Sequence, residues 1–315
     1  MIDLLLLLVG LVFLWFGAAL VITSSQRIAK SLNISEAFIG LTILSIGTSF
    51  PEIMTHIVSS IDILKGIEAS GIAVGTNVGS NLFQITFVVG LVGLLLTIKS
   101  NRTMIHRDYL IMLGSILLLW LFSLNGRIGR LEGVILALLY VAYLAYLGIK
   151  EKVIEKNPFR TDYIKDFALI LSGLAILLIA ADFVVGKALL LSEAWGIAQS
   201  FIGTLIVGVG TALPELTTAL VGIFRKADDI SLGTLIGSNI TNPMLAVGIG
   251  AAISGYAVDK YILWYDIPVW FFLSIIALLF FYRKNKLLRG EALVLILLYF
   301  GYVAFKVFYL DAIFG

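Results

Sequence analysis

Long apolar runs separated by short charged stretches dominate the chain. A membrane-spanning helix needs about 20 mostly apolar residues. Ten runs meet this requirement, at 4–26, 36–61, 69–98, 109–125, 131–149, 167–186, 194–224, 230–257, 262–282 and 291–310. The first run lacks a basic leader and a small-residue cleavage site, so we expect a retained span rather than a signal peptide. The pattern predicts an all-α membrane protein with ten transmembrane helices.

The connections between these runs are too short to hold a soluble domain. The longest, from Lys150 to Asp166, divides the chain into two parts with five spans each. We therefore expect residues 1–150 to form one five-helix unit, residues 151–166 to form a connecting loop, and residues 167–315 to form a second five-helix unit.

Basic residues are concentrated in alternate loops. Sixteen of the 22 Lys and Arg residues fall in the loops near residues 27–30, 99–107, 150–165, 225–226 and 283–289. Lys and Arg in short loops remain on the cytoplasmic side of a membrane. This bias predicts a multi-pass protein of the plasma membrane whose loop 151–166 is cytoplasmic and whose termini are both extracellular.

Composition narrows the class of protein further. The chain is 60% hydrophobic and 13% charged, with a mean hydropathy of +1.05, whereas soluble domains average ~45–50% apolar and ~25% charged residues. The formal net charge of +2 is too small to indicate nucleic-acid binding. With no cysteine and only two histidines, thiol chemistry is absent and a zinc site is not expected.

The two halves of the chain repeat each other. Glycine, hydroxyl, proline, glutamate and asparagine residues recur at offsets of 163, 158 and 159 residues; the matched segments are 38–52 with 201–215, 75–81 with 233–239, and 130–140 with 289–299. Because each half has an odd number of spans, the second half crosses the membrane in the opposite sense to the first. Inverted repeats of this kind are typical of secondary transporters, whose sites lie near the membrane midplane where the repeats meet.

Two glutamates, Glu52 and Glu215, lie deep within spans and occupy equivalent positions in the repeats. An acidic residue at the centre of a span costs about 2.5–3.5 kcal/mol on the insertion scale and indicates function. The alternative is a helix kink whose glutamate forms a salt bridge, but no basic residue lies at matching depth in the sequence.

Each of these glutamates follows a proline. Proline removes the hydrogen bond to the carbonyl four residues earlier, which belongs to Gly47 in the first half and Gly210 in the second. Thr48 and Thr211 add hydroxyls at the same depth. Two carboxylates surrounded by neutral oxygens suit a hard cation such as Ca²⁺.

A second motif follows in each half, with two glycines four residues apart and then a serine and an amide. Ser80 and Gln84 lie four residues apart on one helical face, as do Ser238 and Asn242. These side chains could complete a cation site or relay water, although the glycines would also serve close helix packing alone.

These motifs resemble the two alpha repeats of the sodium/calcium exchanger superfamily, the cation/Ca²⁺ antiporters, over the whole chain. The resembling segments are 47–52 with 79–81 and 210–215 with 237–240. The resemblance implies Ca²⁺ held at the midplane by the carboxylates of Glu52 and Glu215 and by the carbonyls of Thr48 and Thr211. It also implies Na⁺ sites near Ser49, Ser80 and Glu52 in one half and near Thr211, Ser238 and Glu215 in the other, with backbone oxygens from Ser45 and Gly208.

The chain departs from the family pattern at several of these positions. Ala212 stands where a serine is common, Gln84 where an asparagine is usual, and Asn242 where some prokaryotic members have aspartate. His56, one turn after Glu52, stands where a small hydroxyl residue is common. We expect His56 to pack in a polar helix contact, and the alternative is that it tunes the proton affinity of Glu52.

The function expected from this resemblance is secondary antiport of Ca²⁺ against Na⁺, with alternating access around the two glutamates. Exchange of Ca²⁺ for H⁺ on the same fold is the alternative. An intramembrane diacid enzyme is a remote alternative, because no nucleophile and base accompany the glutamates. A passive channel is disfavoured, since no segment resembles a filter loop. The expected partners are the lipid bilayer, Ca²⁺ and Na⁺, with no enzyme activity, cofactor, nucleic acid or obligate protein partner.

Two further acidic residues lie in or near predicted spans. Asp182 falls near the end of the sixth span and Asp266 near the start of the ninth. We expect both side chains to be interfacial.

Overall fold

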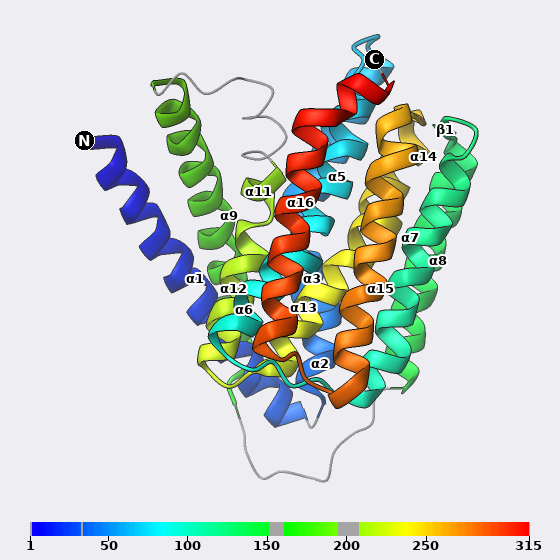
Figure 1. Cartoon of the computed structure of the whole chain (residues 1–315). Helices are drawn as coiled ribbons and strands as arrows, with labels where there is room; N and C mark the ends of the chain where they lie inside the picture. Colours follow the sequence, from blue (N-terminus) through cyan, green and yellow to red (C-terminus); the bar gives the residue numbers. More distant parts are fainter. Residues whose placement is uncertain (1, 33, 151–160, 195–207, 315) are drawn as a thin grey trace.

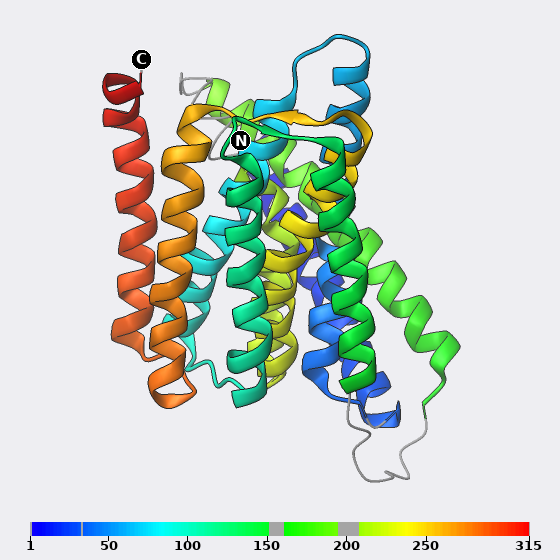
Figure 2. The ribbon, with the colours of Figure 1, turned by 90° about the vertical axis from the view of Figure 1, so that its right-hand side faces the viewer.

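The computed structural model describes residues 2–32, 34–150, 161–194 and 208–314 as a bundle of long helices (Figures 1 and 2). In the first half the elements are α1 (Ile2–Leu32), α2 (Glu36–Ile39), the π-helix η1 (Gly40–Leu44), α3 (Ser45–Thr48), α4 (Phe50–Leu64), α5 (Ser70–Phe83), η2 (Gln84–Val88), α6 (Val89–Leu95), η3 (Met104–Asp108), α7 (Tyr109–Ser123), β1 (Arg127–Ile128) and α8 (Arg130–Lys150).

The second half has a similar series of helices, with its short strand in a different connection. Its elements are α9 (Tyr163–Ala194), α11 (Gly208–Thr211), α12 (Leu213–Phe224), α13 (Asp228–Thr241), η5 (Asn242–Ala246), α14 (Val247–Ser254), β2 (Tyr256–Ala257), η6 (Ile262–Asp266), α15 (Ile267–Lys284) and α16 (Arg289–Phe314). The π-helices η2 and η5 begin at Gln84 and Asn242, and η3 and η6 at Met104 and Ile262. Both pairs have the offset of 158 seen in the sequence, so the repeat extends to local helix geometry.

Short strand contacts link the halves at the two ends of the bundle. Arg127 of β1 pairs with Ala257 of β2, next to the label β1 at the upper end in Figure 1. An isolated bridge joins Lys99, in the connection between α6 and η3, to Lys286, in the connection between α15 and α16. The ends of α15 and α16 that this second connection joins lie at the lower end in Figure 1. The sequence offsets make Lys99 the counterpart of Ala257 and Lys286 the counterpart of Arg127. The same contact therefore occurs once at each end, as inverted repeats require.

Seven helical stretches of the described chain are long and apolar enough to cross a membrane. The pair Glu36–Thr48 and Phe50–Leu64, bent by 44°, adds an eighth span if it is counted as one. The predicted span 194–224 includes residues 195–207, which lie outside the described residues. The all-helical membrane class is thus confirmed, and the count of ten spans remains a prediction.

The two ends of the chain lie at one end of the bundle. Figure 1 marks both termini at the upper end, whereas α8 ends and α9 begins at the lower end. This arrangement fits an even number of crossings, and the side on which the termini lie in the cell remains a prediction.

Helix α13 occupies the centre of the molecule. Every residue from Ile230 to Thr241 is buried, and α13 contacts α2, η1 and α3 of the other half as well as α7 and α12. A Cβ at Gly40 would lie 2.7 Å from the carbonyl oxygen of Ile230, and one at Gly237 would lie 2.6 Å from the Cβ of Ser45. The halves therefore pack at backbone distance through glycine, the contact expected from the second motif.

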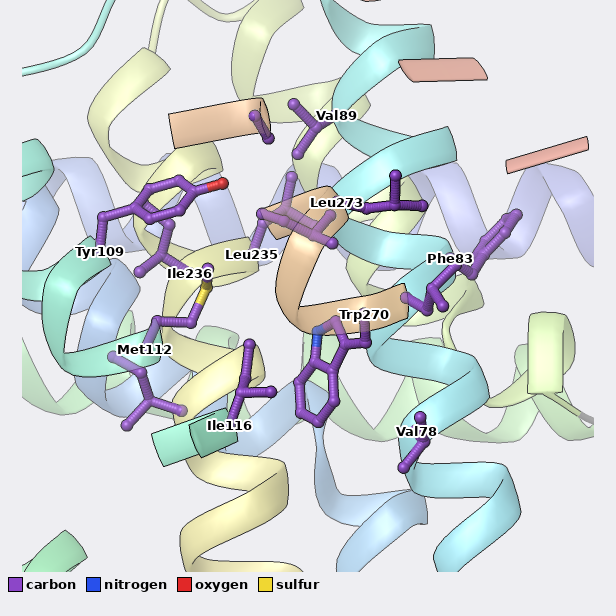
Figure 3. Close-up of a cluster of buried hydrophobic side chains, with 14 of the residues drawn as sticks. Val78, Phe83, Val89, Tyr109, Met112, Ile116, Leu235, Ile236, Trp270 and Leu273 are labelled. Atoms are coloured by element: carbon purple, nitrogen blue, oxygen red, sulfur yellow. The ribbon is translucent and has the colours of Figure 1, made fainter. Parts of the chain in front are cut away.

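An apolar cluster surrounds this centre. Figure 3 shows part of it, with labelled side chains from α5, α6, α7, α13 and α15. Trp270 and Tyr109 are its largest fully buried members. Large apolar side chains such as Leu131 and Ile149 are exposed on the outside of α8. Apolar residues both inside and outside are what a helix bundle in lipid requires.

Candidate functional site

The two glutamates lie in the first turns of equivalent helices. Glu52 follows a break at Ser49 between α3 and α4, and Glu215 follows a break at Ala212 between α11 and α12. Each helix carries its proline in the first turn, where the missing N–H costs least. A helix N-terminus also favours negative charge, so the break positions each carboxylate at a favourable helix end.

Both carboxylates are buried, with 1% of Glu52 and none of Glu215 exposed. The hydroxyl of Ser49 and the hydroxyl of Ser238 each donate a hydrogen bond to Oε1 of Glu215 over 3.3 Å. The carboxyl of Glu52 interacts electrostatically with that of Glu215 and lies beside the side chains of Thr211 and Ser80. Each carboxylate thus has neighbours from both halves of the chain.

Three of the four carboxylate oxygens are unpaired. Both oxygens of Glu52 and Oε2 of Glu215 are buried and have no hydrogen-bond partner among the described residues. Buried polar atoms are nearly always hydrogen-bonded, because an unpaired one costs the full desolvation penalty. No Lys or Arg forms an ion pair with either glutamate in the described part of the chain. A cation bound between them would satisfy all three oxygens.

Of the remaining predicted residues, only Thr48 is placed beside a carboxylate by a contact of the described residues. Thr48 lies beside Glu215, and its hydroxyl donates to the carbonyl of Leu44 over 2.9 Å. The hydroxyl of Ser45 donates to the carbonyl of Leu41 over 2.8 Å. Gly208 begins α11, at the edge of the described residues, so its backbone role stays a prediction.

The two predicted amides differ from each other. Asn239 donates from Nδ2 to Oε1 of Gln84 over 3.1 Å, which leaves Nε2 of Gln84 unpaired. Asn242 donates from Nδ2 to Oδ1 of Asn81 over 3.0 Å, which leaves Oδ1 of Asn242 unpaired. One amide therefore presents a buried nitrogen and its repeat counterpart a buried oxygen.

His56 has polar partners on both ring nitrogens. Nδ1 lies 3.0 Å from the hydroxyl of Tyr256, and Nε2 lies 3.3 Å from Nδ2 of Asn77. The hydroxyl of Ser60 lies 2.8 Å from that of Tyr256 and donates to the carbonyl of Gly250. The structure thus shows the polar helix contact expected for His56. Asn77 and Tyr256 were not among the residues predicted from the sequence, where neither belongs to the matched glutamate motifs.

Asp266, which was expected to be interfacial, is buried inside the protein. It is 1% exposed, accepts a hydrogen bond from the hydroxyl of Tyr302 over 2.9 Å, and forms an ion pair with Lys306 over 2.8 Å. Lys306 lies 40 residues further along the chain, in α16, so hydropathy along the chain did not reveal the pairing. The side chain of Asp182 lies outside the described residues.

Comparison with known proteins agrees with this architecture. The sequence profile described as "Sodium/calcium exchanger protein" matches residues 2–148 and 165–308, one segment in each half. The sodium/calcium exchanger MaX1 of Methanosarcina acetivorans is 32% identical, covering 96% of this chain and 97% of its own. The inner membrane protein YrbG of Escherichia coli is 28% identical, covering 89% of each chain. A solved structure of the sodium-calcium exchanger NCX_Mj superposes with a TM-score of 0.83 at 27% identity, covering 96% of this chain and 98% of its own.

Proposed function

Because this chain belongs to the sodium/calcium exchanger protein family, we propose that it exchanges Ca²⁺ for Na⁺ across a membrane at a site built on Glu52 and Glu215. Its family consists of multi-pass membrane transporters rather than enzymes. The observation that carries the proposal is the pair of buried carboxylates, one from each half, with three unpaired oxygens.

The combined charge of Glu52 and Glu215 supports Ca²⁺ as one of the transported ions. Two carboxylates balance one divalent cation, and the oxygens of Thr48, Thr211, Ser49, Ser80, Ser238 and Ser45, with the backbone of Gly208, supply neutral ligands of the kind Ca²⁺ and Na⁺ accept. Asn242 and Gln84 lie one helical turn beyond Ser238 and Ser80, on the same helical faces. The described residues contain no group of three His, Cys, Asp or Glu side chains, so neutral oxygens must complete any coordination shell.

Competition for the same carboxylates makes exchange obligatory. Na⁺ ions or Ca²⁺ can neutralise the glutamates, but the empty site, with no cation bound, would carry two unpaired buried charges. Moving such charges through lipid is prohibitively costly. The protein can therefore change between its inward-facing and outward-facing states only with a cation bound. Ca²⁺ crosses in one direction only when Na⁺ crosses in the other.

The orientation and cellular membrane follow from the charge bias of the loops and from one relative. The basic loops place the connecting loop in the cytoplasm and both termini outside, and YrbG is named as an inner membrane protein. We therefore infer a plasma-membrane exchanger with extracellular termini.

The deciding experiment is ⁴⁵Ca²⁺ uptake into liposomes that contain the purified chain, with outward gradients of Na⁺, K⁺ or H⁺ imposed one at a time. We expect uptake to require the Na⁺ gradient. An exchange of three Na⁺ for one Ca²⁺ moves one net charge and would generate a current, whereas two H⁺ for one Ca²⁺ would not. Uptake driven by a pH gradient without Na⁺ would replace this proposal with proton/Ca²⁺ exchange, and uptake without any gradient would indicate a channel.

A further inference from the structure

A continuous chain of hydrogen bonds runs from the upper end of the bundle to Asn242. Its links are Tyr256 to His56, His56 to Asn77, Asn77 to Asn81, and Asn81 to Asn242, with lengths of 3.0, 3.3, 3.2 and 3.0 Å. Every one of these side chains is buried. This series of hydrogen bonds connects β2, which follows the span formed by α13 and α14, to the proposed cation site.

Backbone carbonyls fix the direction of these bonds. Nδ2 of Asn81 donates to the backbone oxygen of Asn77 over 2.9 Å, and a carbonyl can only accept. The same nitrogen donates to Oδ1 of Asn77 over 3.2 Å. Oδ1 of Asn81 must then accept from Nδ2 of Asn242, which turns the carbonyl oxygen of Asn242 away from Asn81 and leaves it unpaired.

The same logic fixes the proton on His56. Because Oδ1 of Asn77 faces Asn81, its Nδ2 faces His56 and must donate to Nε2. Nε2 therefore carries no proton, the ring is neutral, and Nδ1 carries the proton that is donated to Tyr256. The hydroxyl of Tyr256 in turn donates to the backbone oxygen of His56 over 3.0 Å.

Among the described residues, the second half of the chain has no such series. The repeat counterpart of His56 is Ala219 and that of Asn77 is Leu235. Trp270 instead donates from Nε1 to Oδ1 of Asn239 over 3.2 Å. That contact turns Nδ2 of Asn239 toward Gln84, whose oxygen is thereby occupied. The two halves thus orient their equivalent amides in opposite ways.

We propose that neutral His56 is a positioning residue for the cation site, which holds Asn242 through Asn77 and Asn81 so that the carbonyl oxygen of Asn242 binds the transported cation. Asn242 lies one turn after Ser238, which donates to Glu215, so this oxygen is on the face of the helix that carries the site. Gln84, its counterpart, presents a nitrogen and repels a cation at the equivalent position. The inference rests on the proposed function only in taking the two glutamates as the centre of that site.

Loss of the acceptor on His56 acts on Asn242 indirectly. Nδ2 of Asn77 would be a buried donor without a partner, which is costly. Rotation of the Asn77 amide to find another acceptor would bring its nitrogen against the nitrogen of Asn81. Asn81 would then hold Asn242 less firmly, and the site would bind its cation more weakly with little change in the rate of transport at saturation.

Two substitutions of His56 distinguish this role from simple packing. His56→Gln keeps an acceptor near the place of Nε2, whereas His56→Asn places its polar atoms only near the position of Nδ1. We expect half-maximal ⁴⁵Ca²⁺ exchange in liposomes at a concentration within about twofold of the wild type for His56→Gln. For His56→Asn we expect that concentration to rise about fivefold, the effect of one hydrogen bond, with an unchanged maximal rate.

The same pair of changes at His106 supplies the control. His106 packs edge-on against Tyr282, far along the chain from these contacts, and neither His106→Gln nor His106→Asn should alter exchange. Asn77→Leu introduces the residue type of Leu235, its counterpart in the second half. It should raise the Ca²⁺ concentration for half-maximal exchange as His56→Asn does. This variant tests the proposal if the His56 variants are not monodisperse.

The proposal is overturned if His56→Asn matches His56→Gln, or if Asn77→Leu leaves the Ca²⁺ concentration for half-maximal exchange unchanged. It is also overturned if these variants lower only the maximal rate. A fully active Glu52→Gln variant would instead remove the proposed function itself, so the two failures are distinguishable.

Discussion

The hydroxyl of Ser49 donates a hydrogen bond to the carboxylate of Glu215, 166 residues further along the chain. Ser49 lies in the helix break of the first half and Glu215 in the first turn after the break of the second. The bond crosses the interface between the repeats, so the proposed cation site takes residues from both halves.

The first prediction concerns the charge of the two glutamates. We expect Glu52→Gln and Glu215→Gln each to reduce ⁴⁵Ca²⁺ exchange by at least about tenfold, because removal of one carboxylate halves the charge that balances Ca²⁺ and ligand charge sets Ca²⁺ affinity. Glu68→Gln is the control, since Glu68 is exposed before α5 and its acceptor for the backbone N–H of Ser70 is retained. Wild-type exchange in either buried variant would contradict the assignment of the site.

The second prediction concerns the close packing of the halves. A methyl group on Gly237 would lie 2.6 Å from the Cβ of Ser45, so Gly237→Ala must move α13 away from α3. Overpacking of this kind costs about 1–3 kcal/mol, and we expect a lower unfolding temperature in detergent.

Gly301→Ala in α16 is the matched control. No described atom lies within 4 Å of a Cβ at Gly301, so alanine should be neutral or stabilising, by up to about 1 kcal/mol, through helix propensity. Equal unfolding temperatures for the two alanine variants would show that the contact at Gly237 does not limit packing.

The third prediction concerns the buried ion pair in the second half. Lys306→Met leaves the carboxylate of Asp266 buried without its cation, with only the hydroxyl of Tyr302 as a donor. Breaking a buried pair in this way costs about 3 kcal/mol, and thermal unfolding in detergent should detect it.

The double variant Asp266→Asn with Lys306→Met should recover most of that loss, because no charge remains buried. Additive losses would show that the two residues act independently.

The fourth prediction concerns orientation. The chain has no cysteine, so single cysteines can be introduced without a background. Ile67→Cys, in the connection before α5, should react with a membrane-impermeant maleimide on intact cells, whereas Thr103→Cys, before η3, should react only after permeabilisation. The opposite pattern would reverse the topology inferred from Lys and Arg.

Much of the architecture follows from local sequence. Apolar runs long enough to cross a membrane predict the helices, and the recurrence of Pro51-Glu52 at Pro214-Glu215 predicts the repeat. The odd number of spans in each half predicts its inversion. The position of each helix break is equally local, because a proline excludes the hydrogen bond four residues back wherever it occurs in a helix.

Other features depended on residues far apart in the sequence. Asp266 was expected at the interface, and its partner Lys306 lies 40 residues away on another helix. The glycine pairs looked alike in both halves, but a Cβ at Gly233 or Gly237 would lie 3.0 Å from backbone of the other half. A Cβ at Gly75 would meet only the tip of Ile262, at 3.6 Å.

The sequence by itself determined that this chain is a helical membrane protein of two inverted repeats, each with a buried glutamate. The length of an apolar run and the cost of burying a charged residue depend on consecutive residues alone, so both can be assessed without knowing the tertiary contacts. Only the tertiary structure decided which atom of each amide is free. Asn242 keeps an oxygen and Gln84 a nitrogen because Asn81 and Trp270, from other helices, fix the direction of their hydrogen bonds. An amide has a donor end and an acceptor end of nearly equal size, and only its neighbours in space determine which end points where.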